Sequence, residues 1–258
     1  MRTPASVLAD TLRSDPARPR VTFYEDTPGA TEGERIELSG KVLANWVSKA
    51  GNALQDEYDL GPGSVIRLAL PPHWRALYWA LAAWSVGATV DLTGEPAADL
   101  LICDDPAALA PRDAVAAIPA PGDVVLVTLD ALARVRTREL PAGAMDEARE
   151  LATHGDQLTA LADPAPDDLA LVTDRARTPY RSVVPVRGWP VGVRVSLAGD
   201  LADVLESALA AWAVDGSVVL IRNGARAGAG SRRDRIASER VTFELAEDET
   251  RQVPDQEV

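Results

Sequence analysis

Apolar residues along this chain follow two patterns, short continuous runs and longer stripes with helical spacing. The clearest stripe begins after Ser39, a residue suited to cap a helix, and predicts a helix that ends near residue 56; it consists of Leu43, Val47, Ala50 and Leu54. Continuous runs predict strands that are buried on both faces, at residues 65–70, 88–92, 100–103, 124–129, 169–173, 193–197, 217–222 and 241–245.

The same patterns predict further helices and a hairpin. The helices span residues 5–12, 73–86, 145–153 and 201–214, and the hairpin joins residues 20–24 to 35–38. Between residues 65 and 92 a strand, a helix and a strand follow one another, with Gly87 ending the helix, which is typical of a crossover in a parallel sheet. We therefore predict an α/β fold with mostly parallel sheets flanked by helices. Residues 1–250 are expected to form one domain and residues 251–258 a frayed acidic tail, while residues 106–122 are left unassigned.

Composition narrows the class of protein. The 258 residues include 26 Lys and Arg against 39 Asp and Glu, a net charge of −13. The negative electrostatic field of such a protein disfavours nucleic acids and membrane surfaces as partners. The single cysteine, Cys103, excludes a disulfide framework. No apolar run has the length of a membrane span, and no signal peptide is recognised, so we expect a cytoplasmic protein.

The conventional catalytic side chains are scarce. His73 and His154 lack metal-ligand spacing and are interpreted as surface or capping histidines. Cys103 follows an apolar run and precedes two aspartates, so a buried strand cysteine is expected rather than a nucleophile. The acidic pairs at 104–105 and 167–168 are interpreted as turn residues. We therefore assign no catalytic residue and no metal site.

One glycine-rich segment, residues 224–233, stands between a predicted strand and a predicted helix. This context suits an anion site, for which Ser231, Arg232 and Arg233 are the candidate ligands. The segment lacks the lysine of a Walker motif and the third glycine of a dinucleotide fingerprint. A solvated loop is the alternative interpretation, with the acidic residues from 244 to 257 offsetting its charge.

Five short phrases occur in the order found in one enzyme superfamily. Residues 38–43 read LSGKVL, residues 61–71 read GPGSVIRLALP, residues 83–90 read AWSVGATV, residues 209–220 read LAAWAVDGSVVL, and residues 240–242 read RVT. In this order they resemble the N-terminal part of the adenylate-forming, AMP-binding acyl-CoA synthetases, with Ser64 in place of that family's aspartate. The resemblance implies that family's α/β fold, in a truncated form.

The residues that make that family enzymes are missing. Its phosphate loop would fall at residues 168–180, but no glycine occurs there and no lysine follows Lys49. A loop without glycine does not readily turn successive N–H groups toward a phosphate. The resemblance therefore implies no transferred catalytic residue. No cofactor is predicted, and ATP, AMP or coenzyme A is expected only if a degenerate pocket still binds it.

Three functions stay open at this stage. The first is a non-catalytic relative of the synthetases, a pseudoenzyme that binds a ligand, a protein partner or a second copy of itself. The second is half of an adenylate-forming ligase completed by a partner chain. The third is an unrelated α/β nucleotide or anion binder that uses residues 224–233. Four tryptophans on two predicted helices are interpreted as core residues, although an exposed Trp79 would mark a contact surface.

Overall fold

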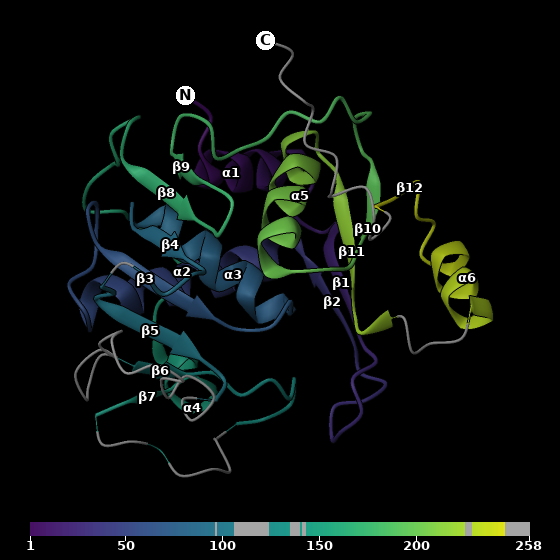
Figure 1. Ribbon diagram of the computed structural model, residues 1–258, viewed down its shortest axis with the longest axis horizontal. Coiled ribbons are helices and arrows are strands. Elements are labelled where there is room, and N and C mark those ends of the chain that lie inside the picture. Colours follow the sequence, from purple (N-terminus) through teal and green to yellow (C-terminus); the bar gives the residue numbers. More distant parts are fainter. Residues whose placement is uncertain (96, 106–123, 135–139, 141–142, 225–228, 246–258) are drawn as a thin grey trace.

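The computed structural model describes residues 1–95, 97–105, 124–134, 140, 143–224 and 229–245. These residues form two mostly parallel sheets with helices packed between and around them (Figure 1). The predicted α/β class is therefore confirmed. The extent of one domain over residues 1–250 stays a prediction, and the tail at 251–258 and the unassigned segment 106–122 lie outside the described residues.

The first sheet has five strands in the order β12–β10–β11–β1–β2. Strand β1 pairs with β2 in the predicted antiparallel hairpin and with the central strand β11 in parallel. The strands are β1 (Pro19–Glu25), β2 (Arg35–Ser39), β10 (Arg194–Leu197), β11 (Ser217–Arg222) and β12 (Phe243–Glu244).

The second sheet has seven strands in the order β7–β6–β5–β3–β4–β8–β9. All its pairs are parallel except β8 with β9. The strands are β3 (Val65–Ala69), β4 (Thr89–Asp91), β5 (Leu100–Cys103), β6 (Val124–Leu126), β7 (Met145–Asp146), β8 (Leu169–Val172) and β9 (Arg177–Pro179).

Helix boundaries agree with the local signals in the sequence. Ser39 caps α2, where its Oγ accepts a hydrogen bond from the Val42 N–H at 3.3 Å. Gly87 follows α3 with a φ of +89°, a left-handed conformation that favours glycine. The helices are α1 (Pro4–Ser14), α2 (Gly40–Asp56), α3 (Trp74–Ser85), α4 (Glu147–Glu150), the 3₁₀ helix η2 (Leu151–Thr153), α5 (Leu201–Ala213) and α6 (Ala229–Ser238).

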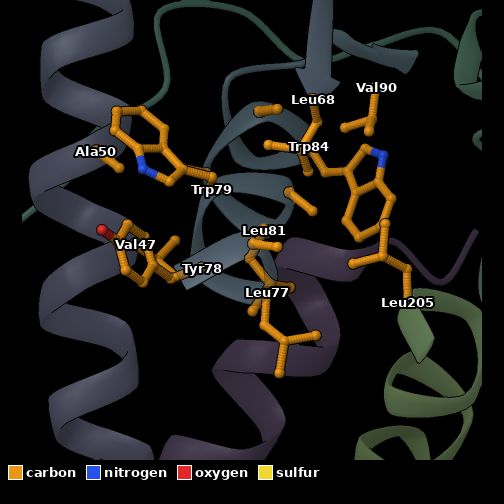
Figure 2. Close-up of a cluster of buried hydrophobic side chains, with 14 of the residues drawn as sticks. Val47, Ala50, Leu68, Leu77, Tyr78, Trp79, Leu81, Trp84, Val90 and Leu205 are labelled. Atoms are coloured by element: carbon orange, nitrogen blue, oxygen red, sulfur yellow. The ribbon is translucent and has the colours of Figure 1, made fainter. Parts of the chain in front are cut away.

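Helix α3 lies in the centre of the molecule and contacts both sheets and α2 (Figure 1). All its residues from 74 to 84 are buried, so it has no solvent face. Trp79 packs beside Ala50 of α2, and Trp84 lies beside Leu205 of α5 (Figure 2). The core interpretation of these tryptophans is confirmed. Trp79 is fully buried, so it cannot mark a contact surface.

Two local predictions need correction, and one strand was not predicted. The strand predicted at 241–245 is the two-residue β12, which is exposed because it is an edge strand with β10 as its neighbour. The helix predicted at 145–153 begins instead with β7, since Met145 and Asp146 extend the sheet beside β6 before α4 starts. The short strand β9 has no counterpart among the predictions.

Glu239, which directly follows α6, joins this helix to the five-stranded sheet. Its carboxylate accepts hydrogen bonds from Tyr24, Arg35 and Arg194 at 2.6–2.8 Å. Burial alone would raise the pKa of Glu239, but the hydrogen bonds from these donors hold it below its ordinary value of 4.5. The ionised carboxylate is therefore the form that the folded protein stabilises.

Because the pKa of Glu239 is lowered on folding, its contribution to stability is present above pH 4.5 and is lost as the pH falls through the folded value. We expect the Glu239→Gln variant to be destabilised by about 1–2 kcal/mol at pH 7. Its stability should also fall less steeply than wild type below pH 4.5. Urea unfolding at pH 7, 4.5 and 3.5 measures both effects. Glu37→Gln, which removes an exposed partner of Arg35, is the control, and equal slopes in wild type and Glu239→Gln would contradict the prediction.

Candidate functional site at the carboxyl edge of the sheets

The carboxyl ends of the central parallel strands surround a cavity of about 370 Å³. Strands β10 and β11 end there, and the segment after β3 contributes Pro72. Ligands of open α/β folds bind at this edge, in the crevice outside the carboxyl ends of the strands. The cavity is lined by Thr27, Pro72, Ala198, Gly199, Ile221, Arg222, Asn223 and Gly224.

Arg222 supplies the charge of this cavity. Its Nη1 donates to Oε2 of Glu25 at 2.9 Å, across the parallel pair of β11 and β1. Glu25 is itself almost fully buried, and its other oxygen accepts the Thr27 N–H at 2.9 Å. The buried carboxylate thus orients the guanidinium at the cavity wall, where Arg222 offers donors to a polar or anionic ligand.

His73 lies next to the cavity-lining Pro72 and caps α3. Its Nδ1 accepts the Arg75 N–H at 3.2 Å, and its ring packs edge-on against Phe23 at 4.4 Å. Burial, together with the charges of Arg75 and Arg222, lowers the pKa of His73 well below its ordinary value. The ring is therefore neutral. Its predicted capping role is confirmed, while the surface position is wrong because only 1% of the residue is exposed.

The two lysines and the single cysteine do not line the cavity. Lys49 of α2 donates to the carbonyl oxygens of Ala152 and His154, the residue that caps η2. Lys41 is exposed in the first turn of α2. Cys103 is buried at the end of β5, as predicted. None of these side chains lines the cavity at the carboxyl edge.

The turn between β8 and β9 occupies the place that the family resemblance gives to a phosphate loop. Thr173 closes this turn: its N–H donates to the Ala176 carbonyl at 2.9 Å. Its Oγ1 accepts the N–H groups of Arg175 and Ala176 at 3.2 and 3.1 Å. Two backbone amides of the turn are therefore engaged by a threonine hydroxyl within the turn.

The one cation in this turn is also engaged. Arg175 Nη2 lies 2.6 Å from Oδ1 of Asp203 and 3.8 Å from Oδ1 of Asp200. Asp200 is the N-cap of α5, and Asp203 lies in its first turn. The side chain of Arg175 thereby links the β8–β9 turn to α5. At the start of β8, Asp168 accepts the Ala165 N–H at 2.7 Å, which confirms its predicted role as a turn residue.

The glycine-rich segment divides between two places. Gly224 lines the cavity at the carboxyl edge, whereas Arg232 and Arg233 line a separate groove beside α6. The predicted helix after the loop is confirmed as α6. The side chain of Ser231 and residues 225–228 lie outside the described part of the chain, so the anion site formed by these candidates stays a prediction.

Sequence reasoning missed the pair of Glu25 and Arg222. Each residue ends a buried strand, and a charge at the carboxyl end of such a strand is the signal that marks them.

Within the described ranges, no group of three or more His, Cys, Asp or Glu side chains is arranged to hold a metal ion. In the same ranges no helix combines the length and the apolar composition needed to cross a bilayer.

The fold is that of the N-terminal part of the acyl-CoA synthetases. An acyl-CoA synthetase of Brucella canis superposes with a TM-score of 0.71 at 17% identity, over 94% of this chain and 47% of that chain. The N-terminal domain of FACL13 from Mycobacterium tuberculosis gives a TM-score of 0.68 at 14% identity, over 98% and 66% of the two chains. This chain thus spans about half the length of the synthetase from Brucella canis, and the resemblance in fold is confirmed.

The family follows from sequence identity. The chain is 34% identical over 250 residues to a TIGR03089 family protein of Mycobacterium tuberculosis, which corresponds to 94% of this chain and 99% of that relative. The chain therefore belongs to the TIGR03089 family. No family model matches it.

Proposed function

We propose that this protein is a non-catalytic relative of the acyl-CoA synthetases that acts as a binding or interaction protein. The observation that carries the proposal is the closed β8–β9 turn, in which Thr173 binds the two amide groups of Arg175 and Ala176. Transfer of an adenylyl group is accelerated largely by groups that stabilise charge on the phosphates. By the resemblance to the synthetases, this turn stands where such groups would be supplied.

The available cations support the same proposal. Arg175 is paired with Asp203, and Lys49 donates to the backbone carbonyls of Ala152 and His154. Lys41 is exposed on α2. Opening the turn for a triphosphate would break the threonine hydrogen bonds and leave Asp203 without its arginine. The binding function is assigned instead to the cavity at the carboxyl edge, where Glu25 orients Arg222 toward a polar ligand.

A second candidate function is half of an adenylate-forming ligase completed by a partner chain. The length of the chain favours it, because this chain covers 47% of the synthetase from Brucella canis. The partner would have to supply a cationic group and hold ATP without help from the β8–β9 turn. A partner chain would therefore have to replace the function of the β8–β9 turn as well as supply the rest of the ligase.

The proposal predicts no release of pyrophosphate and no strong binding of adenylation ligands. The purified chain is heated with millimolar ATP–Mg, AMP, coenzyme A or a non-hydrolysable acyl-adenylate analogue. We expect the midpoint of unfolding to stay unchanged with each of them, because the amides of Arg175 and Ala176 are already bound by Thr173. A ligand at 100 times its Kd would raise the midpoint by roughly 5–10 °C in a protein of this size.

A midpoint shift with the adenylate analogue, together with pyrophosphate release by the chain alone, would overturn the non-catalytic proposal. Release that appears only after a second protein is added would establish the ligase half instead. Arg222→Gln assigns any ligand that does bind to the cavity, since the shift should disappear in this variant. Arg181→Gln changes an exposed arginine outside the cavity and is the matched control.

A further inference from the structure

The connection between β1 and β2 extends beyond the five-stranded sheet (Figure 1) and forms part of the wall of the cavity at the carboxyl edge. Thr27, in this connection, lines the cavity, and its N–H donates to the Glu25 carboxylate that orients Arg222. The hairpin is closed by two backbone hydrogen bonds. The Glu25 N–H donates to the Glu34 carbonyl at 3.1 Å, and the Gly33 N–H donates to the Glu25 carbonyl at 2.8 Å. The position of this hairpin end therefore decides the shape of the cavity.

The side chain of Glu34 joins the hairpin to the segment that follows β6 in the seven-stranded sheet. Its carboxylate accepts the backbone N–H of Ala131. The carbonyl oxygen of the neighbouring Asp130 accepts Nη2 of Arg75, on α3, at 3.0 Å. The second carboxylate oxygen of Glu34, Oε2, is buried and has no hydrogen-bond partner among the described residues. A buried oxygen without a donor makes the ionised form of this carboxyl group costly.

The charges that face Glu34 do not compensate its own. Three charged side chains act on its carboxyl group from other elements, namely Glu25 of β1, Asp130 after β6 and Arg75 of α3. The first two are negative, and the positive one, Arg75, is already paired with Glu147 at 2.8 Å. Within the described part of the chain, Glu34 makes no ion pair of its own. When it ionises, the hairpin end therefore carries a negative charge that lies close to two others.

The hairpin itself supplies no counter-charge either. Arg35, the next residue along the chain, donates instead to Glu37 and Glu239. Burial is the largest cause that raises the pKa of Glu34 above its ordinary value of 4.5, and the negative charges of the neighbouring carboxylates raise the pKa further. The Ala131 N–H and the charge of Arg75 oppose this rise. The docked hairpin consequently favours the protonated, neutral form of Glu34.

We propose that Glu34 is a pH-sensitive latch of the β1–β2 hairpin, which holds the hairpin against the segment after β6 when protonated and loosens it when ionised. Because docking raises the pKa of Glu34, the stabilisation by its neutral form is complete below pH 4.5 and is lost as the pH rises through the raised value. Loosening moves Thr27 away from the cavity. Control of ligand access rests on the binding function proposed above, whereas the latch itself does not.

The experiment is amide hydrogen exchange, measured by NMR on the full chain without any ligand at pH values from 5 to 7.5 and corrected for the intrinsic exchange rate. The Gly33 amide reports on the hairpin, and the Thr27 amide reports on the cavity wall. We expect the protection of both to fall by about threefold or more as the pH rises, since half a pKa unit between the docked and loosened hairpin corresponds to that factor. The Tyr180 amide, which donates to the Asp168 carbonyl at the edge of the other sheet, should stay equally protected.

Three variants assign the effect to this carboxyl group. Glu34→Gln is neutral at every pH, so we expect its hairpin protection to be independent of pH and similar to that of wild type at pH 5. Glu32→Gln removes the same charge from an exposed position of the same hairpin and should keep the wild-type profile. Asp130→Asn removes one of the two facing negative charges and should shift the wild-type transition to lower pH.

Four outcomes would overturn the proposal. They are wild-type hairpin protection that does not change with pH, the same profile in Glu34→Gln as in wild type, a transition that Asp130→Asn leaves in place, and a Thr27 amide that does not follow Gly33. A titration of the Glu34 carboxyl carbon with its midpoint at or below pH 4.5 would also contradict it. No ligand takes part in these measurements, so a cavity that binds nothing would refute the binding function while the latch would still stand.

Discussion

Replacing Glu147 by alanine is expected to lower the free energy of unfolding by about 3–5 kcal/mol, because the change leaves a buried guanidinium without its counter-ion. Glu147 is 2% exposed, and its Oε1 lies 2.8 Å from Nη1 of Arg75, which is 3% exposed. The Tyr78 hydroxyl donates to the same carboxylate oxygen. Urea unfolding at pH 7, followed by tryptophan fluorescence, measures the loss.

Two comparisons show whether the loss comes from the unpaired charge. In the double variant Arg75→Met/Glu147→Leu, both charges are replaced by apolar groups, and we expect it to be more stable than Glu147→Ala. Asp10→Ala breaks exposed ion pairs on α1 and should cost no more than about 0.5 kcal/mol. A cost below about 1 kcal/mol for Glu147→Ala would show that the buried pair does not constrain the fold.

Replacing Trp84 by alanine is also expected to cost about 3–5 kcal/mol, in this case through a cavity in the core. Trp84 is 2% exposed and lies between Leu68 and Val90 on one side and Leu205 on the other (Figure 2). These three residues belong to the seven-stranded sheet and to α5. The indole therefore fills the space between two layers, and denaturant unfolding measures what its loss costs.

The indole N–H of Trp84 makes a second, separable contribution to the free energy of unfolding. It donates to the Ala170 carbonyl in β8 at 2.7 Å. Trp84→Phe keeps most of the volume but removes this donor, so we expect a loss of about 1–3 kcal/mol, smaller than that of Trp84→Ala. Trp46→Phe, at a half-buried position on α2, is the control. Equal losses for the two Trp84 variants would contradict the assignment of the larger effect to packing.

Part of the candidate site could be predicted from local sequence and part could not. The glycine-rich segment that begins at Gly224 could be predicted because its composition, and its place between a strand and a helix, are visible in the local sequence. Glu25 and Arg222 were missed because they are 197 residues apart in sequence and meet only when β1 pairs with β11. The absence of glycine at residues 168–180 predicted a poor phosphate loop. That Thr173 engages two amides of the turn is visible only in the folded chain.

Local interactions explain the elements that were predicted correctly. A cap such as Ser39 or a left-handed residue such as Gly87 acts within a few residues, so the sequence carries the whole signal. The apolar runs likewise predicted most of the strands. Residues 147–153 of the helix predicted at 145–153 are helical, as α4 and η2, but its first two residues form β7 because the pairing of Met145 with Val125 outweighed the helical spacing.

The sequence determined the class of fold, the burial of Cys103 and the lack of a lysine at the phosphate-loop position. Only the tertiary structure decided that the strands divide between two sheets, that α3 has no solvent face and that Arg222 faces a cavity. The physical reason is that strand order and the exposure of a helix face depend on which distant segments pack together. Periodicity within one segment carries no information about its neighbours in space.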